Sequence, residues 1–89
     1  PVLYSELGEL YMKAHRYADA AQVYLDASDD RALVDRKPNF LFLLANAREM
    51  AGDTAGALDA IEQAKQIVPD NPLLQYQEGW IYYHARKFD

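Results

Sequence analysis

Apolar residues recur at helical spacing along this chain, three or four positions apart. No stretch alternates between apolar and polar residues with a period of two, so strands are not expected. The pattern predicts five helices, at about residues 2–14, 17–29, 38–51, 54–67 and 72–85. Three stripes carry it: Leu3, Leu7, Leu10, Tyr11 and Ala14; Phe40, Leu41, Leu44, Ala45 and Ala51; and Leu58, Ile61, Ala64, Ile67 and Val68.

The joins between these helices are short, with the exception of residues 30–37. Short joins force consecutive helices to lie antiparallel. The segment "DRALVDRK" is longer and charged, and its sequence leaves a longer helix end and a loop both open. Asp53 or Thr54 should cap the fourth helix, and Asp70 or Asn71 the fifth, with Pro72 in its first turn.

The first two helix pairs are related by an internal repeat of 37 residues. Small residues recur where one helix would approach its partner closely, at Gly8, Ala45 and, 34 residues further on, Gly79. Large residues fill the surrounding positions. The aligned residues are Tyr4, Leu7, Gly8, Tyr11, Ala20, Tyr24 and Ala27, matching Leu41, Leu44, Ala45, Arg48, Ala57, Ile61 and Ala64.

This register resembles the tetratricopeptide repeat, whose signature is W-x2-L-G-x2-Y, then A-x3-F, then a closing Pro such as Pro69. The resemblance implies an all-α solenoid, a right-handed superhelical stack of antiparallel helix pairs with about five helices. Repeat 1 would span residues 1–34, repeat 2 residues 35–71 with a three-residue insertion, and the first helix of repeat 3 residues 72–89. Arg48 and Glu78 replace apolar residues on neighbouring helices, and we hypothesise that they pair.

The incomplete third repeat and the opening Pro1 predict that the chain is a fragment of a longer array, in which targeting signals cannot be read. The net charge of −5 argues against nucleic acid as a partner. The longest apolar run, Phe40 to Ala45, is too short for a membrane span. With no cysteines and no helical His pair, we expect no catalytic, cofactor or metal site, and a solvated His15.

In tetratricopeptide proteins, one face of each first helix lines a concave groove that binds peptides. The resemblance implies a groove with an aromatic end at Tyr76, Trp80 and Tyr83 and acidic spots at Glu9 and Glu49. Its partner would be an apolar or mildly basic protein segment. The implied site residues are Glu9, Met12, Asn39, Phe42, Asn46, Glu49, Tyr76, Trp80, Tyr83 and His84.

Chaperone-binding members of the family hold a C-terminal carboxylate with Lys, Asn and Arg. The matching positions here are Ser5, Glu9, Leu43, Leu73 and Gln77, so an acidic chaperone tail is not the expected partner. Two alternatives stay open. Tyr76 and Trp80 could contact a further repeat, and the exposed repeat ends could make the chain a homo-oligomer that stacks or exchanges helices.

Overall fold

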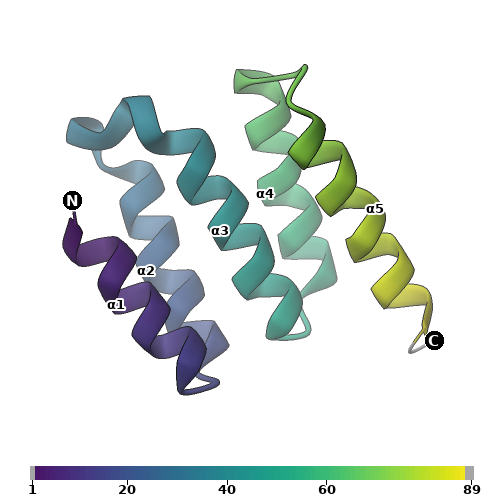
Figure 1. Ribbon diagram of the computed structural model, residues 1–89, viewed down its shortest axis with the longest axis horizontal. Coiled ribbons are helices and arrows are strands. Elements are labelled where there is room, and N and C mark those ends of the chain that lie inside the picture. Colours follow the sequence, from purple (N-terminus) through teal and green to yellow (C-terminus); the bar gives the residue numbers. More distant parts are fainter. Residues whose placement is uncertain (1, 88–89) are drawn as a thin grey trace.

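The computed structural model is all-α, with five α-helices that pack sequentially in adjacent pairs within residues 2–87 (Figure 1). Side chains are described for residues 3–84, and Phe88 and Asp89, which end the predicted third repeat, lie outside the described residues. The all-α expectation is confirmed. The elements are α1 Val2–Lys13, α2 Tyr17–Asp29, the 3-10 helix η1 Arg31–Arg36, α3 Lys37–Met50, α4 Thr54–Ile67 and α5 Pro72–Lys87.

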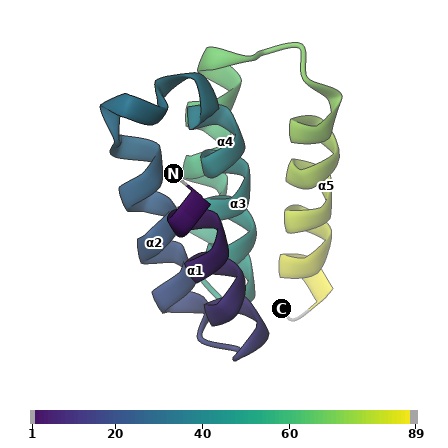
Figure 2. The same ribbon diagram turned by 60° about the vertical axis from the view of Figure 1, so that its left-hand side comes forward.

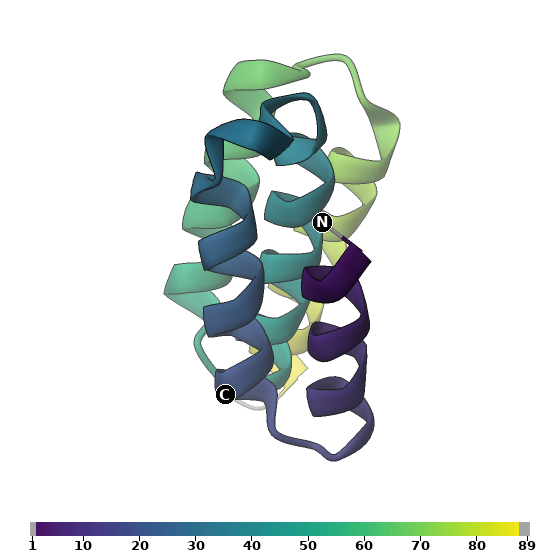
Figure 3. The same cartoon turned by 90° about the vertical axis from the view of Figure 1, so that its left-hand side faces the viewer.

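The helices form two layers, with α1, α3 and α5 on one side and α2 and α4 on the other (Figure 3). The central helix α3 packs against both α2 and α4, whereas α5 meets α4 less extensively (Figure 2). Alanines make up nearly half of the core, which lets the helix backbones approach closely. The buried apolar residues are Ala20, Tyr24, Ala27, Leu33, Phe40, Leu41, Leu44, Ala45, Ala47, Ala57, Ala60, Ile61, Ala64, Leu74 and Ile81.

The turns that follow α1 and α3 have the same conformation, 37 residues apart. Each contains a residue in the left-handed region, His15 with φ 61° and Gly52 with φ 87°. In each turn the next amide donates to the carbonyl five residues back, at 2.8 Å, as in a Schellman motif. The repeat seen in the sequence is therefore repeated in the backbone hydrogen bonds of these two turns. His15 is exposed, as predicted.

Side-chain caps begin α4 and α5 at the predicted positions. The Asp53 carboxylate accepts a hydrogen bond from the Gly56 amide at 2.9 Å. The Asn71 side-chain oxygen accepts from the Leu73 amide at 3.0 Å, and Pro72 occupies the first turn of α5. Each cap satisfies a backbone donor that the first turn of a helix leaves without a partner.

The segment that joins α2 to α3 is helical, which the sequence left open. The Asp30 carboxylate caps η1 by accepting from the Ala32 amide at 2.9 Å, and Leu33 is buried under it. The other Asp30 oxygen accepts from the Tyr4 hydroxyl at 3.3 Å, and the Tyr4 ring packs edge-on against Phe40. Burial and the Asp30 charge both raise the pKa of Tyr4. These contacts tie α1 to the start of α3.

The predicted close approach at small residues is confirmed at one glycine and wrong at another. A Cβ added to Gly8 would lie 2.5 Å from the Tyr24 ring, so α1 and α2 touch there. A Cβ on Gly79 would meet no described atom within 4 Å. The described chain has no helix against the Gly79 face of α5, so that glycine serves no packing contact here.

The hypothesised pair of Arg48 and Glu78 is wrong. Arg48 lies in the last turn of α3, and its Nη1 donates to the Gly56 carbonyl at the start of α4, 3.0 Å away. Glu78 faces α4 and accepts from the Lys65 ammonium at 2.8 Å, a contact that raises the pKa of Lys65. Both polar residues found partners on α4, because α4 lies behind α3 and α5 and is within reach of each.

Candidate functional site

A cavity of about 250 Å³ lies between α3 and α5. Phe42 and Asn46 line it from α3, one helical turn apart, and Tyr76 and Trp80 line it from α5 with the same spacing. These four residues were all predicted to belong to the groove, and the structure brings them together. The cavity is smaller than the pockets that hold most small-molecule ligands, and its size suits a single large side chain.

The rotation of α5 about its axis is set by two buried apolar residues. Leu74 and Ile81 are 2% and 0% exposed and hold α5 against the core. Tyr76 and Trp80 then lie on the flank of that buried stripe, at 74% and 37% exposure. The aromatic rings are therefore reachable from solvent while the helix that carries them is anchored.

Gln77 is the fifth lining residue, and sequence reasoning did not include it in the site. It is 7% exposed, and its Nε2 donates to the Phe42 backbone carbonyl at 3.1 Å. Its Oε1 is buried without a hydrogen-bond partner among the described residues. The signal in the sequence is its position, three residues after Leu74 and four before Ile81, which places an amide on a buried helix face.

Trp80 is held by a second ring. The Trp80 and His84 rings stack in parallel, with centroids 4.6 Å apart and an angle of 14° between the planes. His84 is partly buried and does not line the cavity. The predicted histidine therefore supports the indole that does line it.

Glu49 is not the acidic groove residue that was predicted. It is 5% exposed, its Oε1 accepts from the Thr54 hydroxyl at 3.1 Å, and its Oε2 is buried without a partner among the described residues. The end of α3 turns directly into α4, and that turn covers the carboxylate. The five residues that line the cavity therefore include no acidic group.

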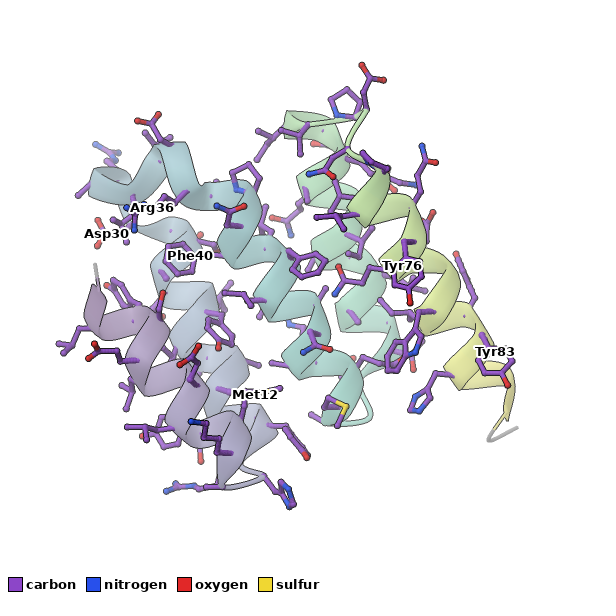
Figure 4. All side chains as sticks on the ribbon, viewed as in Figure 1. Met12, Asp30, Arg36, Phe40, Tyr76 and Tyr83 are labelled. Carbon is purple, nitrogen blue, oxygen red and sulfur yellow. The ribbon has the colours of Figure 1, made fainter. Side chains whose placement is uncertain are left out.

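The remaining predicted residues lie apart from the cavity. Glu9 is exposed on α1, near Tyr24, whose pKa is raised by burial first and by the Glu9 charge second. Met12 packs on the core from α1, across α3 from the cavity, and Tyr83 lies on the side of α5 away from α3 (Figure 4). Asn39 is exposed in the first turns of α3. The ten predicted residues do not form one continuous site.

A larger hollow of about 370 Å³ opens on the other layer, beside α2 and the turn between α3 and α4. Three of its seven lining residues are alanines, which offer few atoms for contact, and its arginine, Arg48, already donates to the Gly56 carbonyl. The aromatic cavity between α3 and α5 is therefore the better candidate. The hollow is lined by Ala18, Ala21, Gln22, Leu25, Arg48, Ala51 and Asp53.

No protein-family model matches this chain, and comparisons with curated proteins and with solved structures find no match. Within the described part of the chain, no three His, Cys, Asp or Glu residues are grouped so that they could hold a metal ion. None of the described helices has the length and apolar character needed to cross a membrane. The geometry of the cavity is therefore the main guide to function.

Proposed function

We propose that this chain is a non-catalytic protein-binding scaffold that holds a peptide segment of a partner against α3 and α5. We propose further that it is a short solenoid of tetratricopeptide-like helix pairs. Three observations support this: the two matching turns at His15 and Gly52, the contact of Gly8 with Tyr24, and the sequential packing of helices. In such a stack the first helices of successive pairs share one face, on which the cavity lies.

The aromatic cavity is the observation that carries the proposal. Phe42, Tyr76 and Trp80 surround a space that one apolar or aromatic side chain would fill. Tyr and Trp are the residues most enriched at the energetic centres of protein interfaces. The stack on His84 already restricts the Trp80 indole. Binding would therefore cost less side-chain entropy at Trp80 than at an unrestricted side chain.

The polar groups at the cavity favour a partner that donates hydrogen bonds. The Gln77 Oε1 must act as an acceptor, because its Nε2 already donates to the Phe42 carbonyl. A buried acceptor without a partner costs about 1–3 kcal/mol, which a donor from the peptide could recover. A backbone N–H or the side chain of Tyr or Trp would serve if a small shift at the cavity floor exposed this oxygen.

The charge of the partner follows from the chain as a whole. With Glu49 buried, no carboxylate lines the cavity, so basic residues would be held only by the aromatic faces and the net charge of −5. An apolar anchor with neutral or mildly basic neighbours fits this surface. An acidic tail does not fit, and the acidic balance of the chain also disfavours RNA.

The lining residues support binding rather than catalysis. They offer two amides, one phenol, one indole and one benzyl group, and none of these forms a nucleophile with an adjacent base. We therefore propose that no reaction takes place at the cavity.

A peptide-display selection on residues 1–89 tests the proposal, with three proteins side by side: the unaltered chain, Trp80→Ala and Tyr82→Ala. Tyr82 is a matched control, because it is an aromatic of the same helix that is 54% exposed and outside the cavity. Loss of a well-packed aromatic anchor should cost roughly 2 kcal/mol or more, which is about thirtyfold in affinity. Peptides enriched by the unaltered chain should be lost by Trp80→Ala and kept by Tyr82→Ala.

Circular dichroism on all three proteins separates lost binding from lost folding. Peptides that bind the unaltered chain and a folded Trp80→Ala variant equally well would show that the cavity is not the binding site. No enrichment by the unaltered chain would refute the scaffold proposal itself.

A further inference from the structure

Helix α1 exposes three leucines on one face. Leu3, Leu7 and Leu10 are 74%, 40% and 62% exposed, although large apolar residues are usually buried. We call these three residues the leucine stripe. The helix that carries it, α1, lies at the opposite end of the row of helices from α5, one of the two helices that line the aromatic cavity (Figure 1).

In the repeat register, the equivalent face is covered in both of the other first helices, α3 and α5. The residues 37 positions after the leucine stripe are Phe40, Leu44 and Ala47 of α3, which are 3%, 0% and 0% exposed. In α5, the residues 34 positions after Phe40 and Ala47 are also buried. Within the described chain, α1 alone leaves this face open. A helix is the element that covers it in the other two cases, since α3 packs on α2 and α5 packs on α4.

The spacing of the leucine stripe suits pairing with a helix of the same kind. The steps from Leu3 to Leu7 and from Leu7 to Leu10 are four and three residues, the spacing of a coiled-coil seam. The exposed Ala14 continues the pattern after four more residues. When two such helices run antiparallel, Leu7 of each lies beside Leu10 of the other.

The charges that flank the leucine stripe also complement each other when two α1 helices run antiparallel. Glu6 and Lys13 are both exposed, lie seven residues apart on one edge of the stripe, and form no ion pair with any described residue. In an antiparallel pair these edges face each other. Glu6 of each copy then meets Lys13 of the other, which gives two opposite-charge contacts related by one twofold axis.

We propose that two copies of this chain associate through antiparallel pairing of their α1 helices along the leucine stripe. The interface is isologous, so it closes as a dimer and does not propagate into a filament. A seam of three leucines is short, so the dimer is weak and depends on concentration. Because α1 and the aromatic cavity lie at opposite ends, the dimer presents two open cavities and would favour a partner with two binding segments.

Sedimentation velocity over a wide concentration range tests this. The average mass of the unaltered chain should rise towards that of a dimer, and Leu10→Glu should hold it at that of a monomer. Leu73→Glu is the matched control, since Leu73 is an exposed leucine on α5, at 58%, and should leave dimerisation unchanged. Leu10 is exposed enough for the variant to keep its fold, which circular dichroism checks.

A charge exchange tests the orientation independently of the leucines. Glu6→Lys alone and Lys13→Glu alone should each weaken the dimer by roughly two- to thirtyfold, and the double exchange should restore it. The unaltered chain remaining monomeric at every concentration would overturn the proposal, as would a dimer that Leu10→Glu leaves intact. Failure of the double exchange to restore affinity would overturn the antiparallel pairing. Trp80→Ala should leave the mass unchanged, so this proposal and the scaffold proposal can fail separately.

Discussion

Two glycines in helix interiors, Gly8 and Gly79, should respond in opposite directions to the same substitution. Gly8 of α1 faces Tyr24, and a Cβ there would lie 2.5 Å from two ring carbons and 2.7 Å from the hydroxyl. Gly79 of α5 faces no described atom within 4 Å. We predict that Gly79→Ala stabilises the fold and that Gly8→Ala destabilises it.

The magnitudes follow from two terms. Replacing glycine by alanine in a helix interior stabilises the helix by about 0.5–1 kcal/mol, and this gain applies equally at both sites. At Gly8 the Tyr24 ring must move, and because that ring is 3% exposed it can move only into packed core. Such overpacking costs about 1–3 kcal/mol. The gain from placing alanine in a helix is the same in both variants, so it cancels when they are compared. Gly8→Ala should therefore be about 1–3 kcal/mol less stable than Gly79→Ala.

Urea unfolding followed by circular dichroism measures both free energies. A difference of about 1 kcal/mol corresponds to roughly 4–8 °C in melting temperature for a domain of this size, so thermal melts provide a second measurement. A second substitution, Tyr24→Phe, removes the hydroxyl and should relieve part of the cost at Gly8 but not affect Gly79→Ala. Equal stability of the two alanine variants would refute the claim that Tyr24 presses against α1.

Two further predictions concern the start of α4 and alkaline pH. Asp53→Ala removes the side-chain acceptor for the Gly56 amide and should lower the free energy of unfolding by about 0.5–2 kcal/mol in urea titrations. Asp70→Ala leaves the Asn71 cap of α5 in place and should change this free energy little. Burial raises the pKa of Tyr24, and the hydrogen bond that Lys65 donates to Glu78 raises the pKa of Lys65, so the unfolded chain loses these protons first as the pH rises. The contribution of these two groups to the free energy of unfolding should therefore be fully present below about pH 10. It should be lost as the pH rises through their folded-state pKa values. Melting temperatures across that range check this, a flat profile would contradict it, and Tyr24→Phe should reduce the fall.

The five helices and their caps could be predicted because short-range rules determine them. Apolar spacing, the capping oxygens of Asp53 and Asn71, and Pro72 each act within one or two turns of the chain. The segment that became η1 could not be assigned in the same way. Its conformation depends on the Asp30 cap and on burial of Leu33, and the second of these depends on where α2 and α3 lie.

The candidate site was predictable only in part. Phe42, Asn46, Tyr76 and Trp80 were placed on one surface by helical spacing and the repeat register, and they do line one cavity. Glu49 was assigned to the same surface by the same spacing, and it is buried. Spacing states which side of a helix a residue occupies, but not whether a neighbouring turn covers that side.

The sequence by itself determined, to within two residues, where the five α-helices begin and end, and it also determined their antiparallel order and the repeat that relates the first two pairs. The tertiary structure alone decided the partners of Arg48, Lys65 and Glu78, the burial of Gln77 in the cavity wall, and the opposite surroundings of Gly8 and Gly79. The first set depends on forces between residues a few positions apart. The second depends on the distance and rotation between whole helices, which follow from how all the core side chains pack together.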